Sequence, residues 1–121
     1  MKKIKLGTKT YNLELTLNNL KDFGMLPSKV EDNTAKLAEL IAALRLGDAF
    51  TLCEVLEKLL AKDGLTSEEI EELVSKDKNL DTLFDDLVDF FSTAPLTKRM
   101  MKKILPTLDN SLKEMDAKLG Q

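Results

Sequence analysis

The chain has 121 residues, with 43% hydrophobic and 32% charged side chains and a net charge of −3, which suits one domain with a substantial core. Histidine is absent and Cys53 is the single cysteine, so the composition excludes His-based catalytic triads, Cys–His dyads, the usual zinc sites and an intrachain disulfide. No apolar run approaches the ~20 residues that span a bilayer, and no long apolar stretch follows the basic start as in a signal peptide. We therefore expect a cytoplasmic protein without membrane contacts.

Residues 1–16 predict a β-hairpin. Apolar residues alternate with polar ones on both sides of Gly7-Thr8-Lys9, and period 2 around a glycine-containing turn is typical of two antiparallel strands. An isolated hairpin is marginally stable in water, so we expect this one to pack against helices. The alternating residues are Ile4, Leu6, Tyr11, Leu13, Leu15 and Leu17.

Residues 17–97 predict a helical core. Thr16 can cap a short first helix that places Leu17 and Leu20 on its inner face. A polar link over residues 27–33 follows, for which the pattern leaves both a helix and a loop open, and the helical pattern becomes clear from Thr34 onward.

Capping residues divide the rest of this core. Gly47 predicts the end of the helix that contains Leu37, Leu40, Ile41 and Leu44, and Asp48 predicts the cap of the next one. Thr66 and Glu69 match a capping box, in which each side chain bonds to the other residue's backbone N–H. The apolar stripe after Asp48 consists of Leu52, Val55, Leu56, Leu59 and Leu60, with Phe50 at its edge.

An acidic helix follows Asn79, whose side chain we expect to cap it. Its apolar residues recur at i, i+3, i+4, i+7, i+8 and i+11, which is one face of a helix, and aspartates occupy the opposite face. Pro95 predicts the end of the helix, because a proline disfavours the helical conformation of the residue before it. The apolar face holds Leu80, Leu83, Phe84, Leu87, Val88 and Phe91, and the acidic face holds Asp81, Asp85, Asp86 and Asp89.

Residues 98–121 predict an amphipathic C-terminal helix. We expect it to be kinked or broken at Pro106, because proline removes one backbone hydrogen bond and clashes with the preceding turn. Its apolar stripe suits either the core of the monomer or a face that binds a partner, and the pattern leaves both interpretations open. The candidate partner anchors are Met101, Ile104, Leu108, Leu112 and Met115.

Charge is unevenly distributed along the chain. Residues 63–91 carry two basic and ten acidic side chains, whereas residues 92–121 carry six basic and three acidic ones. Complementary patches can join copies of one protein head to tail, so we expect a homo-oligomer. The basic cluster has no interleaved aromatic residues for stacking bases, so we expect no nucleic acid. The residues expected to mediate self-association are Asp81, Asp85, Asp89, Lys98, Arg99 and Lys102.

Two acidic stretches fail the pattern of a calcium-binding loop, D-x-[DN]-x-[DN]-G-x5-E. In a loop beginning at Asp77, Thr82 replaces the glycine and Val88 replaces the bidentate glutamate, and an alignment on Gly64 puts apolar residues at ligand positions. The scattered glycines form no phosphate-binding loop. We therefore expect no metal and no cofactor, and the carboxylates opposite the apolar face lack the burial that carboxylate catalysis needs.

Four stretches, in this order along nearly the whole chain, resemble one known family. They are a short basic hairpin, a Gly-Asp corner between helices, an acidic helix start and an acidic helix that ends at a proline corner. They span Lys3–Leu13, Leu46–Phe50, Thr66–Glu72 and Leu83–Lys98. Together they resemble the tail assembly chaperones of long-tailed, siphovirus-type phages that infect Gram-positive bacteria.

The resemblance implies a non-enzymatic protein that binds and solubilises the phage tape measure protein before the tail tube polymerises around it. It implies the tail tube protein as a further candidate partner, a location in the host cytoplasm and absence from the mature virion. The alternative is a small helical regulatory or antitoxin-like protein that binds nucleic acid or a protein partner. In that case the corner at Pro95 before Lys98 is the candidate helix-turn-helix.

Overall fold

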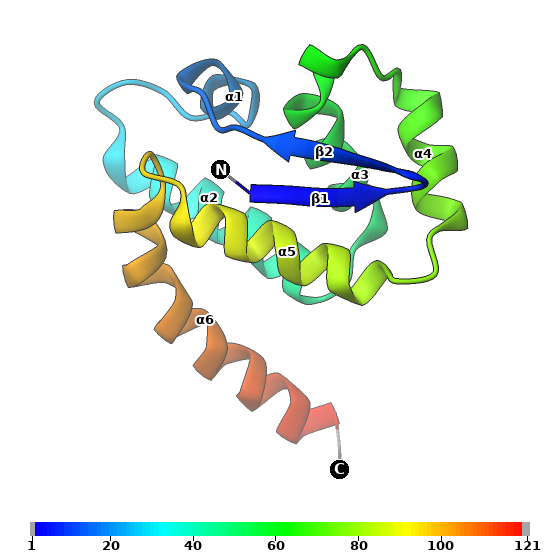
Figure 1. Ribbon diagram of the computed structural model, residues 1–121. Coiled ribbons are helices and arrows are strands. Elements are labelled where there is room, and N and C mark those ends of the chain that lie inside the picture. The colour runs from blue at the N-terminus through cyan, green and yellow to red at the C-terminus, as the bar shows by residue number, and fades with distance from the viewer. Residues whose placement is uncertain (1, 120–121) are drawn as a thin grey trace.

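The computed structural model describes the backbone of residues 2–119 and the side chains of residues 2–111. Over residues 2–119 the chain forms one two-stranded hairpin, six α-helices and a short 3-10 turn, which confirms a mainly α-helical fold with an N-terminal β-hairpin (Figure 1). The elements are β1 (Lys2–Leu6), β2 (Lys9–Leu13), α1 (Leu17–Asp22), α2 (Val30–Arg45), α3 (Ala49–Leu59), the 3-10 turn (Ala61–Asp63), α4 (Ser67–Lys76), α5 (Leu80–Thr93) and α6 (Lys98–Leu119).

The hairpin lies along one side of the helices, with its turn beside α4 (Figure 1). Its strands pair antiparallel, with Ile4 opposite Tyr11 and Leu6 opposite Lys9. The hairpin turn requires glycine at Gly7 for two reasons. The backbone φ of Gly7 is +68°, which is left-handed, and a Cβ at this position would lie 2.8 Å from Cδ2 of Leu73. The hairpin is thus seated tightly against α4, as its marginal stability in isolation requires.

Three of the four helix caps that the sequence predicts are present. The side chain of Asp48 accepts the Phe50 N–H at 3.1 Å, and Thr16 and Thr66 both form capping boxes. Asn79 is the exception, because its side chain makes no capping bond. The prediction of an Asn79 cap was therefore wrong. The Asp77 side chain accepts the Asn79 N–H at 2.6 Å and closes the link before α5.

Helix α2 begins at Val30, so the second half of the 27–33 link, whose state the sequence left open, is helical, and the Asn33 side chain bonds to the backbone of Leu26 across the link. One further prediction, about the first helix, was wrong. Leu17 is 64% exposed rather than on an inner face. The Asn19 amide donates to the Lys58 carbonyl at 3.2 Å, which turns that side of α1 toward α3. Leu17, two residues and roughly 200° earlier on the helix, therefore faces outward.

The core lies between α2, α3, α5, the hairpin and the first half of α6. Helix α2 packs against α3, α5 and α6, while α5 also contacts β1. The predicted stripes of α3 and α5 pack in the core, and Phe91 packs edge-on against Phe23 and Phe90 at 6.0 Å and 5.5 Å between ring centroids. Residues that are at most 1% exposed include Leu6, Leu13, Leu37, Ile41, Leu44, Leu52, Val55, Leu56, Leu59, Leu60, Ile70, Leu87, Phe91 and Met101.

The corner between α5 and α6 depends on one buried hydroxyl. Pro95 has no N–H, so the Phe91 carbonyl lacks the donor that a continuing helix would supply four residues on. The fully buried Thr97 hydroxyl donates to that carbonyl at 2.6 Å instead. Helix α5 can therefore end at proline without leaving a buried carbonyl unsatisfied.

We expect Thr97→Val to lower the free energy of unfolding by about 1–3 kcal/mol, because it keeps the shape of the side chain but leaves the Phe91 carbonyl buried and unpaired. Thr97→Ser keeps the hydroxyl and should cost clearly less. Urea unfolding of both variants measures the difference. Equal stability of the two variants would show that the hydroxyl contributes nothing.

Candidate functional site

The acidic face of α5 is partly occupied within the chain. Lys2 at the start of the hairpin lies 2.9 Å from the Asp89 carboxylate and 3.5 Å from that of Asp86. The hydrogen bond to Asp89 is the largest cause that raises the pKa of Lys2 above its ordinary value, against the opposing effect of burial. Asp81 and Asp85 are exposed. The structure therefore gives Asp86 and Asp89 a role in holding the hairpin, which the sequence pattern did not indicate.

The basic cluster occupies the first two turns of α6. Lys98, Arg99, Lys102 and Lys103 are all exposed, and none forms an ion pair with another described side chain. Cations at the N-terminal end of a helix oppose its dipole, so these residues do not stabilise α6 locally. Their charge is accessible to an acidic partner.

The apolar stripe of α6 divides into a packed part and a part that the structure does not describe. Met101 and Ile104 are 1% and 5% exposed and pack in the core, so their assignment as partner anchors is corrected to core residues. Leu108 is half-buried against the same core. Leu112 and Met115 lie outside the residues whose side chains are described. Periodicity alone could not separate these roles, because it shows that a face is covered but not by what.

Helix α6 is not broken at Pro106. The helix runs from Lys98 to Leu119 with this proline inside it, on its exposed side. The backbone bond that proline removes would have ended at the Lys102 carbonyl, beside the exposed side chains of Lys102 and Lys103. Water can reach that turn, so the missing bond does not force the helix to end there.

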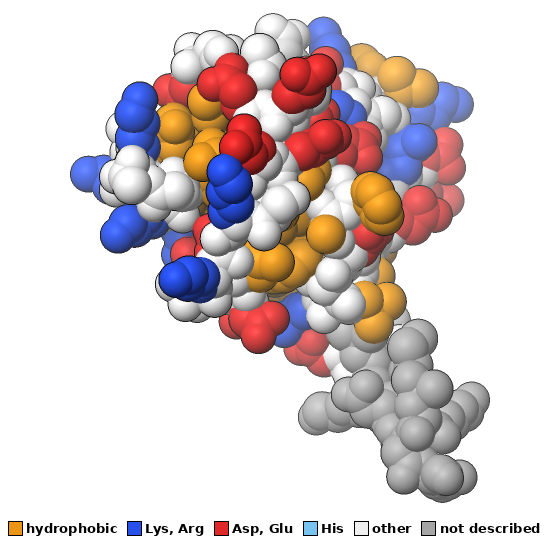
Figure 2. Space-filling model, turned by 90° about the vertical axis from the view of Figure 1, so that its right-hand side faces the viewer, with side chains coloured by type: hydrophobic (Ala, Val, Ile, Leu, Met, Phe, Trp, Pro, Cys, Tyr) orange, Lys and Arg blue, Asp and Glu red, His pale blue; other side chains and the backbone are white. Residues whose placement is uncertain are grey.

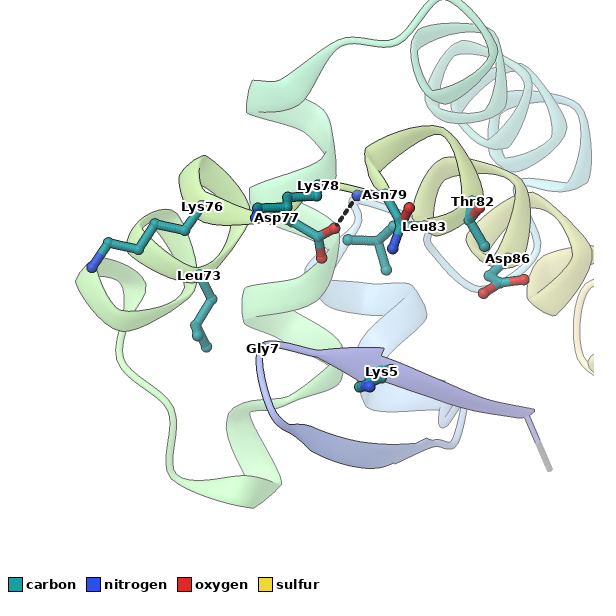
Figure 3. A pocket seen from close by; sticks show the side chains of 10 residues that line it. All are labelled: Lys5, Gly7, Leu73, Lys76, Asp77, Lys78, Asn79, Thr82, Leu83 and Asp86. Atoms are coloured by element: carbon teal, nitrogen blue, oxygen red, sulfur yellow. Dashed lines mark hydrogen bonds between the residues drawn. The ribbon is translucent and has the colours of Figure 1, made fainter.

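One hollow lies where the hairpin turn meets the link between α4 and α5 (Figure 3). It has a volume of about 710 Å³, with Leu73 and Leu83 among its lining residues. Asp77 accepts the Asn79 N–H, and Lys76 is paired with Glu72 at 2.7 Å and points away from the hollow (Figure 3). Asp77 and Lys76, two of its charged residues, thus already have partners within the chain. The hollow lies at the boundary between the hairpin and the helices.

A second hollow, the α3–α4 groove, combines apolar and acidic residues. Its volume is about 520 Å³, and its lining includes Phe50, Cys53 and Leu80 together with Glu57 and Glu71. Burial, followed by the charges of Glu71 and Glu57, raises the pKa of the Cys53 thiol above its ordinary value. The thiol is therefore held in its neutral form, in which a cysteine packs as a small hydrophobic residue.

Phe50 is the residue of this groove whose exposure the sequence pattern did not predict. It stands one position off the buried stripe of α3, and the structure leaves 89% of it exposed. Figure 2 shows hydrophobic side chains exposed among acidic ones on the face of the molecule that carries α4. The sequence signal for its exposure was the position of this aromatic side chain, one residue outside a regular apolar stripe. That signal did not predict a groove.

Among the described residues, no three His, Cys, Asp or Glu side chains gather in a way that could hold a metal ion. Over the same part of the chain, no helix combines the length and the apolar character needed to cross a membrane. Comparisons of the chain with protein-family models, curated proteins and solved structures found no match.

Proposed function

We propose that this protein is a non-enzymatic tail assembly chaperone of a long-tailed phage, which binds and solubilises the helical tape measure protein. The observation that carries the proposal is the overhang of α6. Asp109 on this helix lies 3.6 Å from Arg45, the last residue of α2, and α6 then continues to Leu119. Figure 1 shows this end of α6 projecting away from the other elements.

A projecting helix with one apolar face in its sequence is suited to pairing with a second helix. Leu112 and Met115 continue the spacing of Leu108, so they remain the proposed anchors for the client. The buried Met101 and Ile104 hold the base of the helix in the core, which gives the overhang a rigid support. The tail tube protein stays a further proposed partner.

The proposal is tested by co-expressing the protein with the tape measure protein that it predicts to be encoded just downstream. We expect Leu112→Ser with Met115→Ser to abolish its co-purification, because the apolar anchors are removed, while the melting temperature stays unchanged. Lys113→Ser with Glu114→Ser alters neighbouring off-stripe positions and is the matched control. Full capture by the first variant, or no capture by the natural chain, would contradict the proposal.

We also expect self-association between the acidic face and the basic cluster. Exposed Asp81 and Asp85 on one copy would attract Lys98, Arg99 and Lys102 on another. Sedimentation at rising concentration should show species larger than a monomer that dissociate in high salt, because exposed charges are screened. A monomer at all concentrations in low salt would contradict this prediction.

The alternative function is a small regulatory or antitoxin-like protein. It is favoured only by the four exposed cations at the start of α6, which could contact phosphates. A gel shift that weakens with salt would support this alternative over the chaperone.

A further inference from the structure

The α3–α4 groove has the form of a docking site for one large apolar side chain. Cys53 on α3 and Val74 and Leu80 on the facing elements provide its apolar lining. Phe50 stands at its edge with 89% of its side chain exposed, and Leu46 in the preceding corner is 60% exposed. A single exposed apolar residue is ordinary, but a large aromatic beside an apolar hollow marks a protein-binding surface.

The charges around this groove have one sign. Glu54, Glu57 and Glu71 line it, and no Lys or Arg does so among the described residues. Glu54 is paired with Lys58 at 2.9 Å. Glu57 and Glu71 make no ion pair with any side chain in residues 2–111. Burial, and after it the charges of the same two carboxylates, raises the pKa of Cys53. A partner that buries the apolar lining must therefore satisfy two negative charges.

We propose that this groove binds a basic amphipathic helix of a partner protein, with an apolar side chain inserted beside Phe50 and flanking Lys or Arg residues paired with Glu57 and Glu71. Apolar burial supplies the binding free energy, and the charge pairs supply selectivity between partners. Arginine is favoured over lysine, because its planar group can bind a carboxylate through two hydrogen bonds and stack on the Phe50 ring. This inference is separate from the client site on the α6 overhang.

The test uses two labelled helical peptides that share the same leucines in an alanine background. In one the flanking positions are Arg, and in the other they are Glu. Fluorescence anisotropy with the full chain should show that the Arg peptide binds at least about tenfold more tightly, with a preference that weakens in high salt. Equal binding of the two peptides, or no binding of either, would overturn the proposal.

Three variants locate the interaction. Glu57→Gln with Glu71→Gln should remove most of the preference for the Arg peptide, and Phe50→Ala should weaken both peptides. Glu68→Gln, an exposed residue of α4 outside the groove lining, should leave binding unchanged. An unchanged preference in the Glu57/Glu71 variant would overturn the proposal, and thermal unfolding of each variant confirms that it is folded.

A second copy of this chain is the competing occupant. Leu96 is 40% exposed and is followed by the cations Lys98 and Arg99, so the α5–α6 corner has similar chemistry to the proposed partner. If Phe50→Ala or the Glu57/Glu71 variant abolishes self-association in sedimentation, the groove holds this corner and the assignment to a separate partner is overturned. Failure to capture the tape measure protein bears on the chaperone proposal alone, because neither peptide contains its sequence.

Discussion

A chain that ends at Thr97 is expected to lose its cooperative thermal transition. The cut removes Met101 and Ile104, which are 1% and 5% exposed, and uncovers the faces of α2 and α5 against which they pack. Burying each such side chain contributes about 1.5–3 kcal/mol, and the uncovered faces lose a comparable amount. The total equals much of the roughly 5–15 kcal/mol by which small domains are stable. Circular dichroism during heating measures the transition.

A chain that ends at Ser111 is the matched control. It keeps every described side chain, including Asp109 and its ion pair with Arg45 at 3.6 Å. We expect cooperative unfolding at nearly the temperature of the full chain, because the backbone of α6 after the Asp109–Arg45 pair projects away from the other elements (Figure 1). A cooperative transition at that temperature in the Thr97 truncation would show that α6 adds little to the core.

The features that could be predicted from the sequence are those that local chemistry determines. Alternating apolar residues around Gly7 specify a hairpin whatever packs against it. The cap at Thr16 and the capping box at Thr66 depend only on residues three positions apart. The apolar stripes of α3 and α5 also appear in the core as expected, because helical spacing fixes which side chains share a face.

Most of the features that could not be predicted depend on contacts between distant residues. The exception is the start of α5, where the Asp77 side chain accepts the N–H of Asn79 and nothing in the local pattern indicates that the Asn79 side chain makes no cap. The orientation of α1 follows from the bond between Asn19 and the backbone of Lys58, 39 residues away. The pairing of Lys2 with Asp86 and Asp89 likewise joins residues that are far apart in the sequence.

The candidate sites show the same division. A stripe of apolar residues on α6 predicts a covered face, but only the positions of α2 and α5 show that Met101 and Ile104 are in the core. The α3–α4 groove needs two helices to meet, so neither helix alone predicts it. Phe50 and Glu71 are far apart in sequence and become related only through the packing of α3 against α4.

Phe91→Ala is expected to lower the free energy of unfolding by about 3–5 kcal/mol, since it removes a large side chain and leaves a cavity. Phe91 is fully buried and makes edge-on contacts with the rings of Phe23 and Phe90. Such aromatic pairs add about 0.5–1.5 kcal/mol beyond the area that they bury. The melting temperature should fall on the order of 10–20 °C, given how stability converts to temperature in domains of this size.

Phe50→Ala provides the matched control, because the same substitution at a side chain that is 89% exposed removes almost no contacts. Its stability should stay within about 0.5 kcal/mol of the natural chain. Urea unfolding of the two variants separates core packing from surface exposure at identical chemistry. A large loss of stability in Phe50→Ala would mean that this ring packs against the chain, and the groove beside it would then have no exposed aromatic to offer a partner. A small loss in Phe91→Ala would mean that the aromatic cluster is not the centre of the core.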